Sequence, residues 1–393
     1  MSSVNYLDKL LDGVEVEWKA LGDLALKVSS GGTPRTGVSE YYGGDIPWLR
    51  TQEVDFCDIW DTGIKITQAG LNNSSAKLIP ANCVIIAMYG ATVGKIGINK
   101  IPMTTNQACA NIQFDESTIN YRYAFHCLFN QYDYIKSLGT GSQTNINAQI
   151  VKNLSIPIPC PDNPKRSLEI QAEIVRILDT FTELTAELTA ELTARKKQYN
   201  YYRDQLLTFE EGEVEWRTLG DIVHTITTGK LNANAMSENG EYLFFTCDAN
   251  PFRIDTYAFD TEAIIISGNG SQVGHINYYN GKFNAYQRTY VLADTIPDVS
   301  MRYLLQYLKA HLRAYIFQHS KKGSVPYITM PMLHNFKVPI PKLKTQEQIC
   351  IILEKFDTLT TSITEGLPRE IELRQKQYEY YRDMLLSFPK GEK

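Results

Sequence analysis

The strongest constraint on the fold is that this 393-residue chain contains the same landmarks twice, in the same order. EVEWKALGD at 15–23 returns as EVEWRTLGD at 213–221, and YGATVGKI at 89–96 returns as NGSQVGHI at 269–276. The other pairs are SIPIP (155–159) with KVPIP (337–341), ILDTF (177–181) with ILEKF (352–356), and KQYNYYRDQLL (197–207) with KQYEYYRDMLL (376–386). Internal repeats indicate duplicated structural units. We therefore expect two copies of one block, each followed by a long polar–apolar stretch.

Each block is followed by apolar residues that recur at steps of three, four and seven, which predicts a long amphipathic helix. The first helix should begin at Asn163-Pro164, a suitable cap and first turn. The second should open with the capping-box pattern Thr345-Gln346-Glu347-Gln348, and Gly366 and Pro368 predict a kink or short break in it. The residues expected to pair the helices or dock partners are Ile174, Ile177, Phe181, Leu184, Leu188, Leu192, Tyr199, Tyr202, Ile352, Phe356, Leu359, Ile363, Ile371, Tyr378 and Tyr381.

Inside the first stretch, residues 182–194 read TELTAELTAELTA, a Thr-Ala-Glu-Leu unit close to one helical turn in length. Each copy adds about 6 Å of helix and turns its face by only about 40°, so the segment can change length and keep its apolar stripe. Neither helix is stable alone, and we expect the two to pair as a coiled coil. Because the first leads from block one to block two and the second must return, the pairing should be antiparallel. For the Thr-Ala-Glu-Leu copies themselves, the alternative is that they are a relic of replication slippage and have no structural consequence.

The blocks themselves mix strands and helices. Strand-like segments occur at 83–90, 155–159, 241–247 and 263–270, and helical stretches are expected near 120–138 and 299–318. The predicted fold class is α+β, with two mixed α/β domains joined by two long antiparallel helices in a coiled coil and related by a pseudo-twofold internal repeat. The expected divisions are block one at 1–160, the first helix at 161–208, block two at 209–343 and the second helix at 344–388.

The first residues resemble the end of a helix whose body is missing. YLDKLL at 6–11 is similar to YRDQLL at 202–207, and both lead through acidic residues and glycine into Val-Glu-Trp. We therefore expect residues 4–11 to form a short helix that docks near the end of the second long helix. Trp18 and Trp216 are expected to pack where each block meets its helix.

Composition excludes several classes of protein. The 43% apolar and 21% charged fractions are those of a folded, soluble chain, and no apolar run approaches the roughly 20 residues that span a bilayer. The N-terminus lacks the apolar region of a signal peptide, and the seven cysteines are scattered without a C-x-x-C pair. These features predict a cytoplasmic protein with reduced thiols.

The net charge of −5 bears on nucleic-acid binding, because a free-standing DNA-binding protein is usually basic. Only residues 213–344 carry more basic than acidic side chains. If this protein binds DNA, we expect a partner to supply much of the phosphate neutralisation.

The loops of the blocks are rich in Gly, Ser, Thr, Asn and Gln. Amide and hydroxyl side chains suit base edges, and the few Lys and Arg suit phosphates; ordinary turn chemistry explains the same composition. Asn106-Gln107 and Gln287, next to expected core strands, are interpreted as structural. The candidate DNA-binding residues are Thr33, Arg35, Thr36, Arg50, Tyr89, Thr92, Lys95, Thr140, Ser142, Gln143, Asn145, Lys230, Asn232, Asn234, Asn269, Ser271, Gln272, Lys321, Lys322, Ser324 and Tyr327.

Catalytic motifs are not found. GATVGK at 90–95 resembles a phosphate loop, but the spacing is short and Ile96 stands where Ser or Thr must bind magnesium. The six histidines show no metal-ligand spacing, and G-x-S-x-G does not occur. No catalytic residue and no metal site is predicted. The chain lacks the motifs that a stand-alone methyltransferase or nuclease needs. A coiled-coil scaffold with two protein-binding heads remains an alternative function.

The order block–helix–block–helix resembles the specificity (S) subunit of type I restriction-modification enzymes. The resemblance is carried by SIPIP and KVPIP leading into EIVRILDTF and QICIILEKF, by the Thr-Ala-Glu-Leu copies and by RKKQYNYYRDQLL. The segments YLDKLLDGVEVEW and GLPREIELRQKQYEYYRD look most like the IC branch. GGTP…YYGGDIPW at 31–48 is a common variant of such blocks, and the second block lacks its Ile-Pro-Trp.

The resemblance implies a function. Each block would be a target-recognition domain that reads one half of an asymmetric, bipartite site in double-stranded DNA. Two methylation (M) subunits would dock on the helices and domains, bind S-adenosylmethionine and flip out adenines, and restriction (R) subunits would add ATP- and magnesium-dependent translocation and cleavage. This chain itself would hold no cofactor and catalyse nothing.

Overall fold

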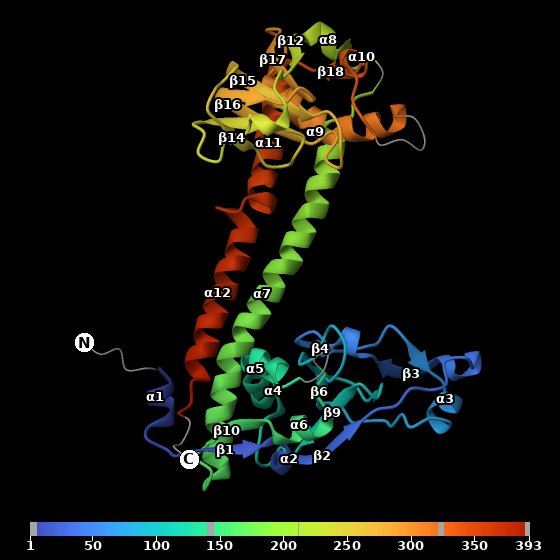
Figure 1. Ribbon diagram of the computed structural model, residues 1–393, viewed down its shortest axis with the longest axis vertical. Coiled ribbons are helices and arrows are strands. Elements are labelled where there is room, and N and C mark those ends of the chain that lie inside the picture. The colour runs from blue at the N-terminus through green and yellow to red at the C-terminus, as the bar shows by residue number, and fades with distance from the viewer. Residues whose placement is uncertain (1–5, 140–144, 211, 321–325, 390–393) are drawn as a thin grey trace. The chain divides into compact units, whose positions relative to one another are not determined.

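The computed structural model describes residues 6–139, 145–210, 212–320 and 326–389. The chain divides into two compact units (Figure 1). Unit 1 comprises residues 1–187 and 371–393, and unit 2 comprises residues 188–370. Each unit therefore holds one block together with parts of the long helices.

Unit 1 contains a five-stranded sheet of order β2-β9-β6-β7-β4, a three-stranded sheet β5-β3-β8 and the antiparallel pair β1-β10. Its strands are β1 (Val16–Ala20), β2 (Ala25–Ser30), β3 (Tyr42–Leu49), β4 (Cys57–Ile59), β5 (Lys65–Ile66), β6 (Val84–Ala87), β7 (Ile96–Asn99), β8 (Thr104–Thr105), β9 (Cys109–Phe114) and β10 (Ser155–Pro159). Its short helices are α1 (Tyr6–Leu11), α2 (Leu21–Leu24), η1 (Ser39–Tyr41), η2 (Thr51–Glu53), α3 (Gln68–Asn72), α4 (Tyr121–Asn130), α5 (Tyr132–Ser137) and α6 (Ala148–Asn153).

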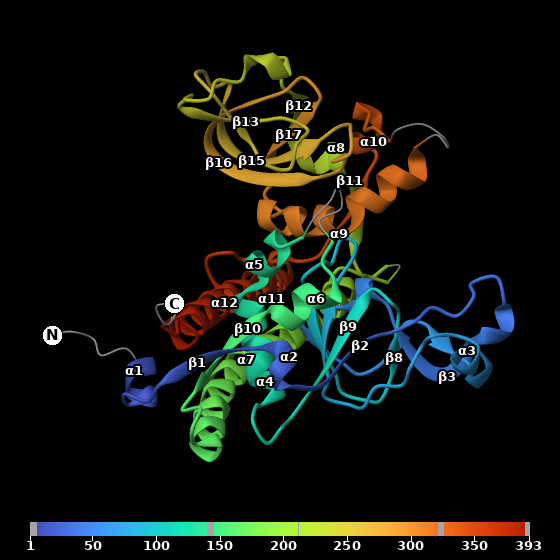
Figure 2. The ribbon, with the colours of Figure 1, turned by 60° about the horizontal axis from the view of Figure 1, so that its bottom comes forward.

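Unit 2 contains a six-stranded sheet of order β12-β17-β15-β16-β13-β14 and the antiparallel pair β11-β18. Its strands are β11 (Glu215–Thr218), β12 (Val223–Thr228), β13 (Tyr242–Phe245), β14 (Phe252–Ile254), β15 (Phe259–Ser267), β16 (Ile276–Ala285), β17 (Thr289–Thr295) and β18 (Lys337–Ile340). Its helices other than the long ones are α8 (Leu219–Ile222), η3 (Ala233–Ala235), α9 (Met301–His319) and α10 (Met330–His334). Figure 2 shows α9 along one face of the sheet that contains β15 and β16.

The same frame is built twice, as the repeats predict. In unit 1, Trp18 of β1 pairs with Pro157 of β10, and in unit 2 Trp216 of β11 pairs with Pro339 of β18. The antiparallel pairs β2–β9 and β6–β7 of unit 1 have counterparts in β12–β17 and β15–β16 of unit 2. The observed fold is the predicted α+β class with an internal repeat.

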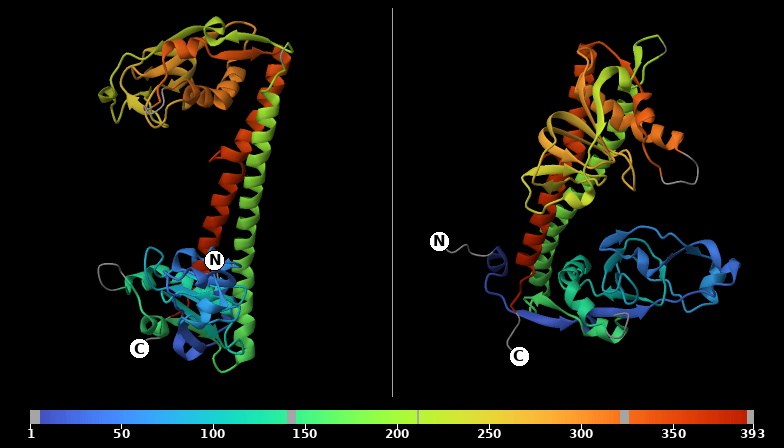
Figure 3. Two further views of the ribbon diagram at one scale, coloured as in Figure 1. Left: turned by 90° about the vertical axis from the view of Figure 1, so that its right-hand side faces the viewer. Right: turned by 45° about the horizontal axis from the view of Figure 1, so that its top comes forward.

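The long helices differ in continuity. Helix α7 runs without interruption from Pro164 to Leu206, and Asn163 caps it by accepting a hydrogen bond from the Arg166 amide (3.1 Å). The second stretch is interrupted as predicted: α11 (Leu343–Thr361) and α12 (Gly366–Leu385) are separate helices (Figure 3). The predicted capping box is wrong, because α11 begins two residues before Thr345, with Lys342 as its N-cap.

Within each unit the helices pair antiparallel. In unit 1 the rings of Phe181 and Tyr381 stack 5.1 Å apart, and Leu385 near the end of α12 shares a buried cluster with Ile170 near the start of α7. In unit 2 the ring of Tyr202 lies 5.8 Å from that of Phe356, whereas Leu206, farther along α7, packs in the cluster of Ile349, earlier in α11.

Two residues of the set predicted to pair the helices or dock partners do not pack between the helices, so only partner docking stays a prediction for them. Ile363 falls in the interruption between α11 and α12 and is 80% exposed, because no helix continues there to direct it inward. Ile352 is 38% exposed, and its neighbours Ile349 and Leu353 are buried in its place. The other members whose partners are not named above are buried or half-buried: Ile174, Ile177, Leu184, Leu188, Leu192, Leu359, Ile371 and Tyr378.

The N-terminal helix α1 docks as predicted. Helix α1 lies beside the end of α12 (Figure 1), and its residues Leu7 and Leu11 are buried in one cluster with Leu385, the last residue of α12, and Phe388. The predicted residues 4 and 5 lie outside the described part of the chain. The indole Nε1 of Trp18 donates a 3.0 Å hydrogen bond to the carbonyl of Pro389. Its counterpart Trp216 remains 42% exposed, so only the first tryptophan packs as predicted.

Candidate nucleic-acid interface

The candidate loops of unit 1 are joined by a chain of hydrogen bonds. The hydroxyl of Thr33 donates to the side-chain carbonyl of Gln107. The Met88 amide donates to Ala108 (2.8 Å), and the Ile146 amide donates to the Met88 carbonyl (3.0 Å). Four loops far apart in sequence, around Thr33, Gln107, Tyr89 and Asn145, therefore meet at one edge of the block.

Unit 2 builds the same edge from different side chains. The Gly268 amide donates to Arg288 (2.9 Å), and the Ile328 amide donates to the Gly268 carbonyl (2.8 Å), as at Met88 in unit 1. The Gln287 amide donates to Leu231 (2.9 Å), which brings in the loop that carries Lys230 and Asn232. Repeated backbone contacts thus hold two loop sets that differ in sequence.

The first loop of each set begins with a glycine that lies against neighbouring backbone, Gly31 in unit 1 and Gly229 in unit 2. A Cβ on Gly31 would lie 1.9 Å from the Thr105 carbonyl oxygen, and one on Gly229 would lie 1.8 Å from that of Ala285. Any side chain here would overlap backbone. The close approach fixes where each loop leaves its strand, β2 or β12.

The turn between β6 and β7 in unit 1 and the turn between β15 and β16 in unit 2 have the same backbone hydrogen bonds. In 89–95 the amides of Val93 and Lys95 donate to Gly90 and Thr92 (3.1 and 2.9 Å). The equivalent bonds in 269–275 are Val273 to Gly270 (3.2 Å) and His275 to Gln272 (2.9 Å). Both turns place two glycines at positive φ, Gly90 and Gly94 in the first, Gly270 and Gly274 in the second. The segment GATVGK, which resembles a phosphate loop in sequence, is therefore a hairpin turn between β6 and β7.

The structure separates the candidate residues into three groups. Most lie exposed or half-buried on the loop edges: Thr33, Arg35, Thr36, Tyr89, Asn145, Lys230, Asn232, Asn234, Asn269, Ser271, Gln272 and Tyr327. Three have partners within the fold: Thr92 donates to the Thr51 carbonyl (2.8 Å), Lys95 pairs with Asp55 (2.6 Å) and Arg50 pairs with Glu53 (3.5 Å). Six fall outside the described residues: Thr140, Ser142, Gln143, Lys321, Lys322 and Ser324.

The interpretation of the residues next to the core strands needs correction. Asn106 is structural, because its side chain accepts a 3.1 Å hydrogen bond from the Ala108 amide. Gln107 and Gln287 are exposed on the loop edge, as is Arg288, which the sequence reading passed over. Asn106-Gln107 and Tyr286-Gln287 stand at the same offset in the two repeats and share the glutamine, which was the available signal. The turn before β9 and β17 leaves Gln107 and Gln287 exposed.

Each block is fixed to a long helix by a buried glutamine. Gln171 of α7 accepts from the Asn120 amide (2.8 Å) and donates to the Thr118 carbonyl (3.3 Å). Gln346 of α11 accepts from the Ser300 amide (2.9 Å) and donates to the Asp298 carbonyl (2.8 Å). Both glutamines are buried, so each one fixes the start of α4 or α9 to a long helix.

A second joint in unit 1 is a charge cluster of Arg122, Asp179, Asp58 and His126. The guanidinium of Arg122 donates to both oxygens of Asp179 (2.6 and 2.8 Å) and to both of Asp58 (3.0 and 2.9 Å). His126 Nε2 lies 2.8 Å from Asp179 Oδ1. Burial would raise the pKa of Asp179, but the hydrogen bonds from His126 and Arg122 outweigh it and hold that pKa below its usual range.

The imidazole of His126 makes unit 1 sensitive to acid. Burial lowers its pKa although Asp179 opposes this. Since the folded-state pKa lies below the unfolded value of about 6.5, the stability contribution is complete above that pH and falls as the pH drops below it. We expect His126→Gln, the residue type at the matching position 306, to make the decline below pH 6.5 shallower by up to about 1.4 kcal/mol per pH unit.

Chemical denaturation of the full chain at several pH values between 5 and 8 measures this effect. His311 of unit 2, whose pKa is also lowered by burial, is present in both proteins, so the difference between them isolates His126. Parallel curves for the two proteins would contradict the assignment.

The described part of the chain shows neither a metal centre nor a membrane-spanning helix. Among the described residues, no group of three or more His, Cys, Asp or Glu side chains is arranged to hold a metal ion. No helix in the described part of the chain combines the length and apolar character needed to cross a bilayer. What the loop edges offer chemically is a set of amides, hydroxyls and a few cations, which suits recognition of polar surfaces.

Comparison with known proteins identifies the family. The model of the type I restriction modification DNA specificity domain matches residues 13–195 and again residues 211–373. The type I restriction enzyme EcoR124I/EcoR124II specificity subunit of Escherichia coli is 37% identical, with 100% of this chain and 99% of that protein covered. The EcoprrI specificity subunit of Escherichia coli is 36% identical over 93% of each chain.

Solved structures agree in fold. The type I restriction-modification S subunit of M. genitalium matches with a TM-score of 0.61 at 17% identity, over 97% of this chain and 98% of that one. A chain from a structure that describes complex assembly and conformational transition of the type I system matches with a TM-score of 0.62 at 17% identity, over 94% and 97%. With two matched specificity domains and full-length relatives, this chain belongs to the family of type I restriction-modification specificity subunits.

Proposed function

We propose that each unit reads one half of an asymmetric, bipartite site in double-stranded DNA, with the loop edge of its block facing the bases. The observation that carries this proposal is a repeated backbone frame with unlike loops. The bonds at Met88 and Ile146 recur at Gly268 and Ile328, whereas the side chains on the loops differ. Two readers with one scaffold and different targets require this arrangement.

Contacts to base edges are assigned to the exposed amides and hydroxyls, because these groups donate and accept hydrogen bonds in the major groove. Exposed Arg35 and Lys230 are assigned to phosphates. Lys95 and Arg50 are weaker candidates, since each already pairs with a carboxylate. We add Gln107 and Arg288 to the proposed interface.

The long helices are proposed to set the distance between the half-sites and to dock two methylation subunits, through which restriction subunits join. Exposed apolar side chains on them, including Ile351, Leu373 and Tyr380, suit partner contacts. The relatives named above are specificity subunits, and we infer that this chain likewise catalyses nothing. S-adenosylmethionine, and ATP with magnesium, are assigned to the partner subunits.

The test is to co-express the full chain with the methylation subunit of the same organism and to map the methylated adenines by sequencing. We expect one motif with two short defined halves and a gap of fixed length. A contiguous motif would contradict reading by two units. A stable complex that leaves DNA unmethylated and unbound would favour the scaffold.

A further inference from the structure

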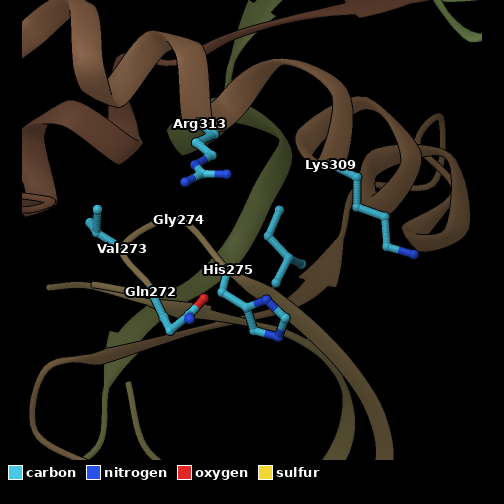
Figure 4. A pocket seen from close by; sticks show the side chains of 7 residues that line it. Gln272, Val273, Gly274, His275, Lys309 and Arg313 are labelled. Carbon is cyan, nitrogen blue, oxygen red and sulfur yellow. The ribbon is translucent and has the colours of Figure 1, made fainter. Parts of the chain in front are cut away.

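Unit 2 contains a basic pocket beside the turn 269–275, which joins β15 to β16. The pocket has a volume of about 290 Å³ and is lined by Gln272, Val273, Gly274 and His275 of the turn, by Ile276 of β16, and by Lys309 and Arg313 of α9. Figure 4 shows the Arg313 side chain reaching from α9 toward the turn, with Gln272 and His275 on the opposite side. None of the described residues that line it is a carboxylate.

The two cations are not equally available. Lys309 Nζ lies 3.6 Å from Asp357 of α11 and points away from Arg313 (Figure 4). The guanidinium of Arg313 lies over the ring of Phe317, 5.7 Å from its centroid, and Figure 4 shows its nitrogens on the side of the turn. The side chains of Gln272 and His275 add further hydrogen-bond donors. The pocket therefore presents one principal cation surrounded by further donors.

The equivalent place in unit 1 is filled and neutralised. Helix α5 packs closely against the turn 89–95, and α9 packs closely against the turn 269–275. A Cβ on Gly94 would lie 3.4 Å from Tyr132, and one on Gly274 would lie 3.0 Å from Ile316. In unit 1, however, Phe56 stacks on Phe129 with centroids 4.3 Å apart and meets Tyr132 edge-on at 5.0 Å.

The charges differ as well. At the same offset along the repeat, Phe129 stands in place of Lys309 and Asp133 in place of Arg313. Lys95, which corresponds to His275, is bound to Asp55 at 2.6 Å. At this place unit 2 thus carries a cationic pocket, whereas unit 1 has packed aromatic rings and a Lys95–Asp55 pair.

We propose that the unit 2 pocket binds one phosphate of the DNA backbone through Arg313, with Gln272 and His275 as further donors. A planar guanidinium matches phosphate oxygens in a two-point contact. The pocket adjoins the turn whose tip is assigned to base contacts, so a phosphate bound here fixes the register of the second half-site on the duplex. The inference rests on the proposed function and makes the two units unequal in how they hold DNA.

The test measures DNA affinity of the full chain in complex with its methylation subunits at several salt concentrations. Two duplexes of one length are used, one with the mapped site and one with a scrambled sequence. Arg313→Gln is expected to weaken binding to both about tenfold and to lower the slope of log affinity against log salt by about 0.9, the loss of one phosphate contact. Arg313→Lys should keep most of the slope because it keeps the charge.

Controls separate the possible outcomes. Lys337→Gln removes an exposed cation of β18 at the joint with β11 and should leave affinity and slope unchanged, and Lys309→Gln should have a smaller effect than Arg313→Gln. The methylated motif should stay the same in all variants. An unchanged affinity for Arg313→Gln, or a loss confined to the cognate duplex, would overturn the phosphate assignment while leaving the proposed function standing. A wild-type complex that binds neither duplex would overturn the proposed function itself.

Discussion

A variant with one additional Thr-Ala-Glu-Leu unit in α7 is expected to methylate a site whose halves keep their sequences but stand farther apart. Helix α7 is continuous from Pro164 to Leu206 and begins in unit 1 and ends in unit 2, so added residues lengthen the helical connection. Four residues add about 6 Å, which corresponds to at most about two base pairs at 3.4 Å each. Methylation of the original site should be lost.

The local structure explains why the insertion should be tolerated. The hydroxyls of Thr185 and Thr193 donate to carbonyls one turn earlier in the same helix (2.8 and 3.0 Å). Leu184, Leu188 and Leu192 form the half-buried stripe, and a four-residue insertion turns that stripe by only about 40°. The new unit therefore repeats the existing pattern of contacts.

Methylation mapping of the insertion variant measures the gap directly. The matched control replaces Thr189 and Thr193 by alanine without changing the length, and it should leave both halves and the gap unchanged. An insertion variant that modifies the original site, or that alters a half-site with the gap unchanged, would contradict the role of α7 as a spacer.

Features set by local patterns were predicted from the sequence. The start of α7 at Pro164 and the interruption near Gly366 each follow from a residue type that acts within a few residues. The docking of α1 is a contact between distant segments, and it was predicted only because the repeat shows which segment 6–11 resembles. The duplicated frame was likewise predicted, because both copies keep the landmarks of the strands and turns. Such features depend little on distant parts of the chain.

Features set by distant contacts were not predicted. Gln346 looked like part of a capping box, but it is buried and bonds to the backbone at Ser300 and Asp298. The unit 2 pocket depends on whether a segment such as Asp55-Phe56 covers the turn, and no local pattern near Lys95 or His275 reveals this. The exposure of Gln107 depends on how the turn before β9 is oriented. Each is decided by packing between segments far apart in sequence.

The largest expected loss of stability comes from Arg122→Met in unit 1. The change removes a cation that bridges Asp179 and Asp58, whose side chains are 17% and 31% exposed, and leaves their carboxylates without that partner. Breaking such a pair on one side costs about 3 kcal/mol. Because Arg122 joins α4 to α7 and β4, we expect faster hydrogen exchange in 121–130 and weaker methylation that depends on the first half-site. Segment-resolved hydrogen exchange of the full chain measures the first effect.

The matched control is Arg302→Met in unit 2, where Arg302 pairs with Glu354 across the same joint (Nε to Oε1, 2.8 Å). That pair is far more exposed, so its loss should cost less than about 1 kcal/mol.

The pH dependence of the stability adds a second check. The pKa of Asp179 is lowered in the folded state, so its contribution is present above about pH 4 and is lost as the pH falls through the folded-state value. The difference between wild type and Arg122→Met should therefore shrink toward low pH, and equal losses for the two arginine variants at neutral pH would show that the buried cluster of unit 1 has no special role.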